Sequence, residues 1–205
     1  ASGQVTEHEI RVASNLMDRM RLAGELRVRA QESFRLGKES DFPLRETLAE
    51  FRQASQGQRD ILRFFLEVQL QAAFADGKVE ANERAILQTI ADELGFSRIE
   101  LARILAMAEA QMNFFHRQQQ SGQGQQYRQE PPSRDRLKDA YQLLGVSESD
   151  SDQEIKRAYR KEMSKHHPDK LAAKGLPPEM MEMAKEKTQE IQQAWEWIRE
   201  ARGIR

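Results

Sequence analysis

The chain has 205 residues, of which 32% are charged and 39% hydrophobic, and its formal net charge is −1. This balance gives no overall field that would attract nucleic acid or anionic lipid. The chain has no cysteine, which excludes disulfides and thiolate chemistry and suits a reducing compartment. No apolar run approaches the length needed to span a bilayer, and no signal peptide is visible.

Residues 1–116 place apolar side chains at helical spacing, and no stretch alternates with period two. This pattern predicts an all-α unit without strands. We expect helices over about 6–22, 25–36, 43–55, 58–74, 81–94 and 97–115. The fourth of these is apolar around much of its circumference, which predicts a place at the centre of the core.

Residues 75–79 (ADGKV), with Glu83, resemble the TerB-like (tellurite-resistance) helical domain. The resemblance implies a helical bundle over 1–116. The family's leading helix has no counterpart here, and residues 1–5 look like the interior of a domain, so we expect the N-terminus to be truncated.

Asp76, Glu80 and Glu83 could supply oxygen ligands to a metal ion. The segment lacks the ligand spacing of a calcium loop, however. A simpler interpretation is a turn at 76–77 followed by a carboxylate that favours a helix start. We therefore expect no metal and no cofactor, with these residues as weak candidates only.

Residues 117–133 are rich in Gln, Gly and Pro and have almost no apolar content. Such a segment cannot offset the entropy of ordering, so a flexible linker is predicted. We expect it to separate two units that fold independently, 1–116 and 134–205.

Residues 151–166 predict a two-faced helix that opens with the capping-box pattern SDQE. One face is apolar, and the other carries Lys156, Arg157, Arg160, Lys161 and Lys165. Pro168 ends the helix because it disfavours helical geometry at His167 and brings no N–H donor. Asp169 is then expected at a stiff loop tip. By itself the basic stripe fits an ordinary solvated face better than a binding surface.

The flanking segments point to a domain type. Residues 139–144 predict a short apolar helix closed by Gly145, and a long helix follows to about Arg199. Residues 139–146 (DAYQLLGV), 158–161 (AYRK), 167–169 (HPD) and 190–195 (EIQQAW) together resemble the J-domain of Hsp70 co-chaperones. The resemblance implies an antiparallel helical hairpin with the following core residues: Tyr141, Leu144, Ile155, Ala158, Tyr159, Met163, Ile191, Ala194 and Trp195.

The resemblance also implies a binding site for an Hsp70 such as DnaK. It would consist of His167, Pro168, Asp169, Lys156, Arg157, Arg160, Lys161 and Lys165. A TerB-like domain, a Gln/Gly linker and a C-terminal J-domain in this order resemble the DjlA type of bacterial co-chaperone. That type carries an N-terminal membrane helix, absent here, and faces the cytoplasm at the inner membrane.

The function implied is stimulation of ATP hydrolysis by the Hsp70, with the N-terminal domain binding a partner or forming a homodimer. The alternative is an adaptor in envelope-stress or capsule signalling. An enzyme using His166, His167 and Asp169 as metal ligands or acid/base groups is disfavoured, because adjacent histidines rarely converge on one ion and the other two, His8 and His116, lie in the other domain. Nucleic-acid binding is disfavoured because the basic stripe lacks interleaved aromatic residues.

Some positions depart from the J-domain pattern. Glu162 stands where an apolar residue is expected, so its carboxylate must reach solvent or find a partner. Thr188 stands where a Phe is common, and His166 replaces a common aromatic residue. These departures put the stability of the domain in question more than its contacts with a chaperone.

Overall fold

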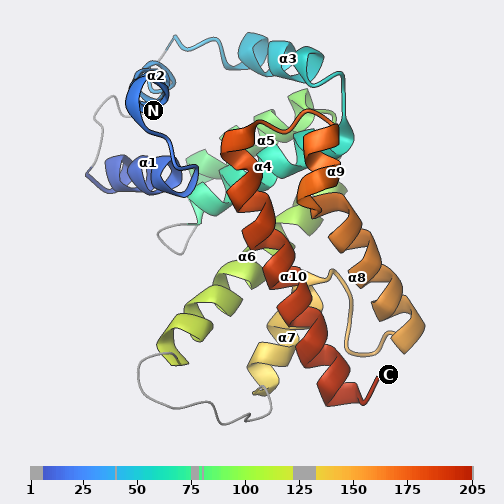
Figure 1. Ribbon diagram of the computed structural model, residues 1–205. Helices are drawn as coiled ribbons and strands as arrows, with labels where there is room; N and C mark the ends of the chain where they lie inside the picture. The colour runs from blue at the N-terminus through green and yellow to red at the C-terminus, as the bar shows by residue number, and fades with distance from the viewer. Residues whose placement is uncertain (1–6, 40, 75–78, 80, 122–132, 205) are drawn as a thin grey trace.

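The protein is all-α, as predicted. The computed structural model describes residues 7–39, 41–74, 79, 81–121 and 133–204, and these contain helices and no strand. The helices are α1 (Glu7–Arg19), α2 (Gly24–Leu36), α3 (Leu44–Ala54), α4 (Arg59–Ala73), α5 (Ala81–Glu93), α6 (Arg98–Ser121), α7 (Arg134–Leu143), α8 (Asp152–His166), α9 (Pro168–Ala173), a 3₁₀ turn (Pro178–Met180) and α10 (Met181–Arg202). Figure 1 shows α1–α5 gathered at one end, with α6, α7, α8 and α10 extending away from them.

The first core lies among α3, α4, α5 and α6. Leu66 and Leu70 of α4 are completely buried there, in one cluster with Leu94 and Phe96, which follow the end of α5. The N-terminus of α6 is fixed by Ser97 and Glu100, which exchange side-chain-to-backbone hydrogen bonds as a capping box does. This core confirms that the fourth predicted helix is central.

The second core holds α7, α8 and α10 together. Ile155, Ile191 and Ala194 have 1% of their surface exposed or less, and Tyr159 stacks on Trp195 with ring centroids 5.0 Å apart. The capping box of α8 is formed in both directions by Ser151 and Glu154. α8 and α10 thus pair in the way that the sequence pattern predicts.

A third cluster joins the two units and was not predicted. Ile61, Phe64 and Val68 of α4 pack against Leu171 of α9 and Met183 of α10, together with Leu176 and Ala184. Because α4 contributes to cores on both sides, it needs apolar residues around most of its circumference. The two units therefore pack directly on each other.

The predicted linker, 117–133, begins inside a helix. α6 continues to Ser121, and α7 starts directly after Ser133, whose side chain accepts a hydrogen bond from the Arg136 backbone N–H. Residues 122–132 lie outside the described part of the chain. α6 and α7 pack against each other on either side of that segment (Figure 1).

Among the helices described, none combines the length and the apolar character needed to cross a bilayer.

Candidate functional site

The end of α8 is a corner between two helices. His167 has extended backbone angles (φ −61°, ψ 123°), and Pro168 is the first residue of α9. The Nδ1 atom of His167 accepts a hydrogen bond of 3.2 Å from the backbone N–H of Asp169. The expectation of a loop tip at Asp169 is therefore wrong: Asp169 lies in the first turn of a short helix. Proline at a first helical position has no N–H to leave unpaired, which explains why the chain can restart as a helix.

Asp169 itself is exposed, and its carboxylate makes no hydrogen bond or ion pair within the described residues. The next residue, Lys170, donates to the hydroxyl of Ser164 over 2.6 Å and so ties α9 back to α8. The corner therefore presents the Asp169 carboxylate to solvent, and its backbone is held by the bond to His167 before it and by the bond of Lys170 to Ser164 after it.

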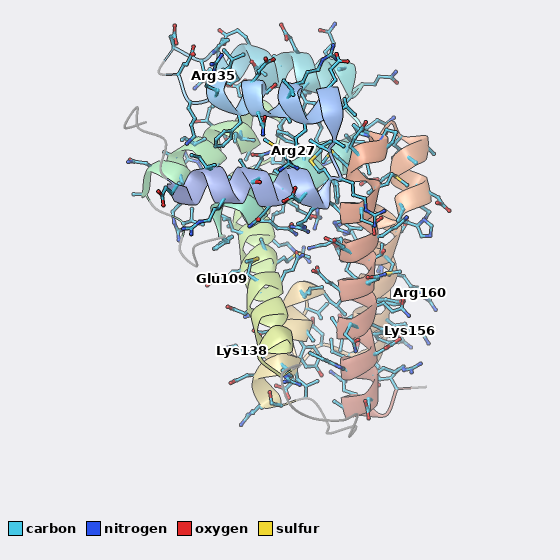
Figure 2. All side chains as sticks on the ribbon, turned by 60° about the vertical axis from the view of Figure 1, so that its left-hand side comes forward. Arg27, Arg35, Glu109, Lys138, Lys156 and Arg160 are labelled. Atoms are coloured by element: carbon cyan, nitrogen blue, oxygen red, sulfur yellow. The ribbon has the colours of Figure 1, made fainter. Side chains whose placement is uncertain are left out.

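The basic residues of α8 divide into two groups. Arg157, Arg160 and Lys161 are exposed, and Figure 2 shows Lys156 and Arg160 projecting from α8 away from the other helices. Lys165 is different: it is 20% exposed, and its Nζ lies 2.8 Å from Glu162 Oε1. Burial lowers the pKa of Lys165, although the adjacent Glu162 favours its charge. Lys165 therefore faces the protein rather than the exposed basic face.

Glu162 finds its partners in the other domain. Its side chain is 7% exposed, and Oε2 accepts a hydrogen bond of 3.2 Å from Arg63 Nη2 of α4. Arg63 also donates to Glu67 Oε1, one helical turn further along α4, over 2.8 Å. The Glu162 carboxylate was expected either to reach solvent or to find a partner, and it finds a partner, Arg63.

His166 is buried beside this pair, 2% exposed. Its Nδ1 lies 2.9 Å from the backbone carbonyl oxygen of Glu162, and its Nε2 lies 2.7 Å from Glu67 Oε2. A carbonyl oxygen only accepts, so Nδ1 carries a proton. Burial raises the pKa of Glu67, but His166, Lys187 and Arg63 outweigh it and hold this pKa below its ordinary value. The Glu162 carbonyl and the Glu67 carboxylate thus hold the His166 ring at both of its nitrogens.

A second polar group lies further along the interface. Lys187 of α10 is 7% exposed and donates to Gln111 of α6, and Gln111 in turn donates to Glu190 of α10. Burial raises the pKa of Glu190 to about 7, against the opposing influence of Lys187 and Arg19. The nearby Glu186, which pairs with Arg19 at 2.6 Å, raises the pKa of Glu190 further.

The raised pKa of Glu190 makes stability depend on pH. The folded chain binds more protons than the unfolded chain between about pH 4.5 and 7, so stability falls as the pH rises through this window. Glu190→Gln should raise the free energy of unfolding by about 2–3 kcal/mol at pH 8, and much less at pH 4.5. Urea unfolding at both pH values measures this. Glu200→Gln, which alters an exposed acid of the same helix, is the control. An equal effect of Glu190→Gln at the two pH values would contradict the prediction.

The other sequence candidates do not form a site. Asp76 and Glu80 lie outside the described residues, and Glu83 lies in the first turn of α5. No group of metal-ligating side chains occurs within the ranges that the structure describes. His166 is buried against α4 while His167 is exposed and caps α9, so the two rings do not converge.

Sequence reasoning missed Arg63 and Glu67, the α4 partners of α8. A signal was present, because an oppositely charged pair at i, i+4 lies among the apolar residues in the middle of α4. Burying such a pair without further partners would be unfavourable, so the pair itself indicates polar groups on whatever covers α4.

Comparison with known proteins agrees with this architecture. The protein-family model described as tellurite resistance protein TerB matches residues 1–106. The protein-family model described as DnaJ domain matches residues 139–203. Proteins named co-chaperone protein DjlA are similar over the whole chain: 57% identical in Photobacterium profundum, 56% in Vibrio cholerae and 52% in Escherichia coli O157:H7. The chain covers 74% of the first two relatives and 75% of the third. No solved structure matches the chain significantly.

Proposed function

From the premise that this chain belongs to the DjlA family of co-chaperones, we propose that its J-domain docks on a DnaK-type Hsp70 and stimulates that protein's ATP hydrolysis. The observation that carries the proposal is the exposed carboxylate of Asp169, held at a proline corner beside the exposed cations of α8. The chain needs no catalytic group of its own, because it acts as an activator of another protein's active site.

The two parts of this surface have different tasks. Arg157, Arg160 and Lys161 lie on the exposed side of α8, where they can attract and hold an acidic patch on the chaperone. Asp169 can accept charge-assisted hydrogen bonds from an arginine of the chaperone. Attraction by exposed charges governs mainly the encounter, whereas the bonds of Asp169 act once the complex has formed. The same family membership supports two further parts of the proposal: the TerB domain binds a further partner, and the protein is located at the inner membrane.

Single-turnover hydrolysis of ATP by a bacterial Hsp70, with and without the full chain, tests the proposal. The chain should raise the rate. Arg160→Glu should raise the half-saturating concentration about three- to tenfold at low salt, with a smaller effect at high salt because exposed charges are screened. Arg35→Glu is the matched control, since Arg35 is exposed on α2, far from α8 (Figure 2). An Hsp70 rate that the wild-type chain leaves unchanged would refute the proposed function.

A further inference from the structure

The His-Pro-Asp corner is bracketed by contacts with the TerB domain. Immediately before it, His166 bonds to Glu67 of α4 over 2.7 Å. Two residues after it, Leu171 of α9 is completely buried in the cluster that includes Ile61, Phe64 and Val68 of the same helix. The motif therefore lies between two contacts with α4, which we call anchors: the bond of His166 before it and the burial of Leu171 after it.

We propose that Glu67 and Arg63 are positioning residues, through which the TerB domain fixes the orientation of the His-Pro-Asp corner presented to the chaperone. This inference rests on the proposed function. It assigns the TerB domain a direct part in the stimulation step, in addition to any role in recruiting a partner.

The polar anchor restrains the last turn of α8 in two directions. Arg63 holds the Glu162 carboxylate at 3.2 Å, and Glu67 holds the His166 ring at 2.7 Å. The His166 ring also bonds to the backbone carbonyl of Glu162, so the side chain and the main chain of this turn are linked to the same pair on α4. Charged hydrogen bonds with few exposed atoms are short and directional, which makes them suitable for fixing an orientation.

The second anchor holds the helix that follows the corner. Besides the burial of Leu171, Lys174 at the end of α9 forms an ion pair with Asp60 of α4. α9 has only six residues, too few to hold a fixed direction by its own backbone hydrogen bonds. The direction of α9, and with it the direction of Asp169, is therefore set by the helices around it, α4 together with α8 and α10.

The anchors leave the exposed basic face untouched. Arg157, Arg160 and Lys161 are exposed on α8, and the buried Glu162 and His166 lie on its side toward α4. Loss of the anchors should thus change how the corner acts after docking, with little effect on docking itself. This separation is what distinguishes positioning from a general loss of structure.

The test uses Glu67→Gln in the full chain, which keeps the side-chain shape and removes the charge that faces His166. A misplacement of about 1 Å can lower a reaction rate by about a hundredfold. We expect the maximal stimulated ATP hydrolysis to fall about tenfold and the half-saturating concentration to change less than about twofold, because only the orientation loosens. Hydrogen–deuterium exchange should become faster at residues 166–171 and remain unchanged at residues 155–161.

Two further variants complete the test. Arg103→Met removes another contact between the units, the bond of Arg103 Nη2 to the Gly145 carbonyl at 3.1 Å, far from the corner. It should leave the maximal rate unchanged. Asp60→Asn removes the carboxylate that pairs with Lys174 in the α9 anchor and should lower the maximal rate about twofold, which keeps the proposal testable if Glu67→Gln does not fold.

The outcomes separate the two proposals. A wild-type chain that fails to stimulate the Hsp70 refutes the proposed function, and the exchange data then still decide whether α4 restrains the corner. A wild-type chain that stimulates, with Glu67→Gln and Asp60→Asn retaining the full maximal rate, overturns the positioning role. Variants that stimulate more than wild type would likewise overturn it and make the interface inhibitory.

Discussion

Asp169→Asn is expected to lower the stimulation of Hsp70 ATP hydrolysis by tenfold or more while leaving the fold intact. The carboxylate is exposed and has no partner within the described residues, so its removal breaks nothing inside the protein. In the complex it would accept charge-assisted hydrogen bonds, each of which contributes about 1.5–3 kcal/mol. A tenfold change corresponds to about 1.4 kcal/mol, so the loss of a single such bond suffices.

Single-turnover hydrolysis at saturating concentrations of each variant provides the measurement. Glu179→Gln is the matched control, because Glu179 is also an acid in the first turn of a short helical segment, between α9 and α10. It should stimulate as the wild type does. Equal stimulation by Asp169→Asn and the wild type would remove Asp169 from the proposed site.

Most of the helices, though not α9, and most of the J-domain core, though not Ala158, could be predicted from the sequence because local signals define them. Ser151 and Glu154 form the capping box that their spacing indicates, and Gly145 adopts the positive φ of 67° expected after a helix end. The pairing of α8 with α10 follows from apolar residues at helical spacing, which end in the stacked Tyr159 and Trp195.

The interface between the units could not be predicted in this way. Its contacts join residues about a hundred positions apart, such as Arg63 with Glu162 and Glu67 with His166, and no local pattern specifies them. The departures from the J-domain pattern were indirect signals. Glu162 and His166 replace apolar or aromatic residues because their neighbours on α4 are charged, so both substitutions are explained by one interface.

Lys165 shows the limit of helical periodicity as a guide to function. Its position on α8 groups it with Arg157 and Arg160 on a basic face. The ion pair with Glu162 nevertheless draws its ammonium group toward the interface. Periodicity gives the direction in which a side chain leaves a helix, while the partners within reach decide where its charged group lies.

The Phe64→Ala variant should destabilise both domains, although Phe64 belongs to the TerB domain. Phe64 is 3% exposed and lies in the cluster that joins α4 to α9 and α10. Truncating a buried phenylalanine to alanine typically costs about 3–5 kcal/mol. Because the cluster is shared, part of this loss must fall on the J-domain, which contributes Leu171 of α9 and Met183 of α10 to the cluster and whose last turn of α8 bonds to α4.

The fluorescence of tryptophan measures this effect, since both tryptophans, Trp195 and Trp197, are in the J-domain. In urea, the fluorescence transition of Phe64→Ala should shift to a lower midpoint together with the far-UV circular dichroism transition. Ile99→Ala is the control, because Ile99 is 83% exposed on α6 and its truncation should change stability by less than about 0.5 kcal/mol. A fluorescence midpoint that Phe64→Ala leaves in place would mean that the J-domain unfolds independently of α4. The anchors around the His-Pro-Asp corner would then contribute too little energy to hold its direction.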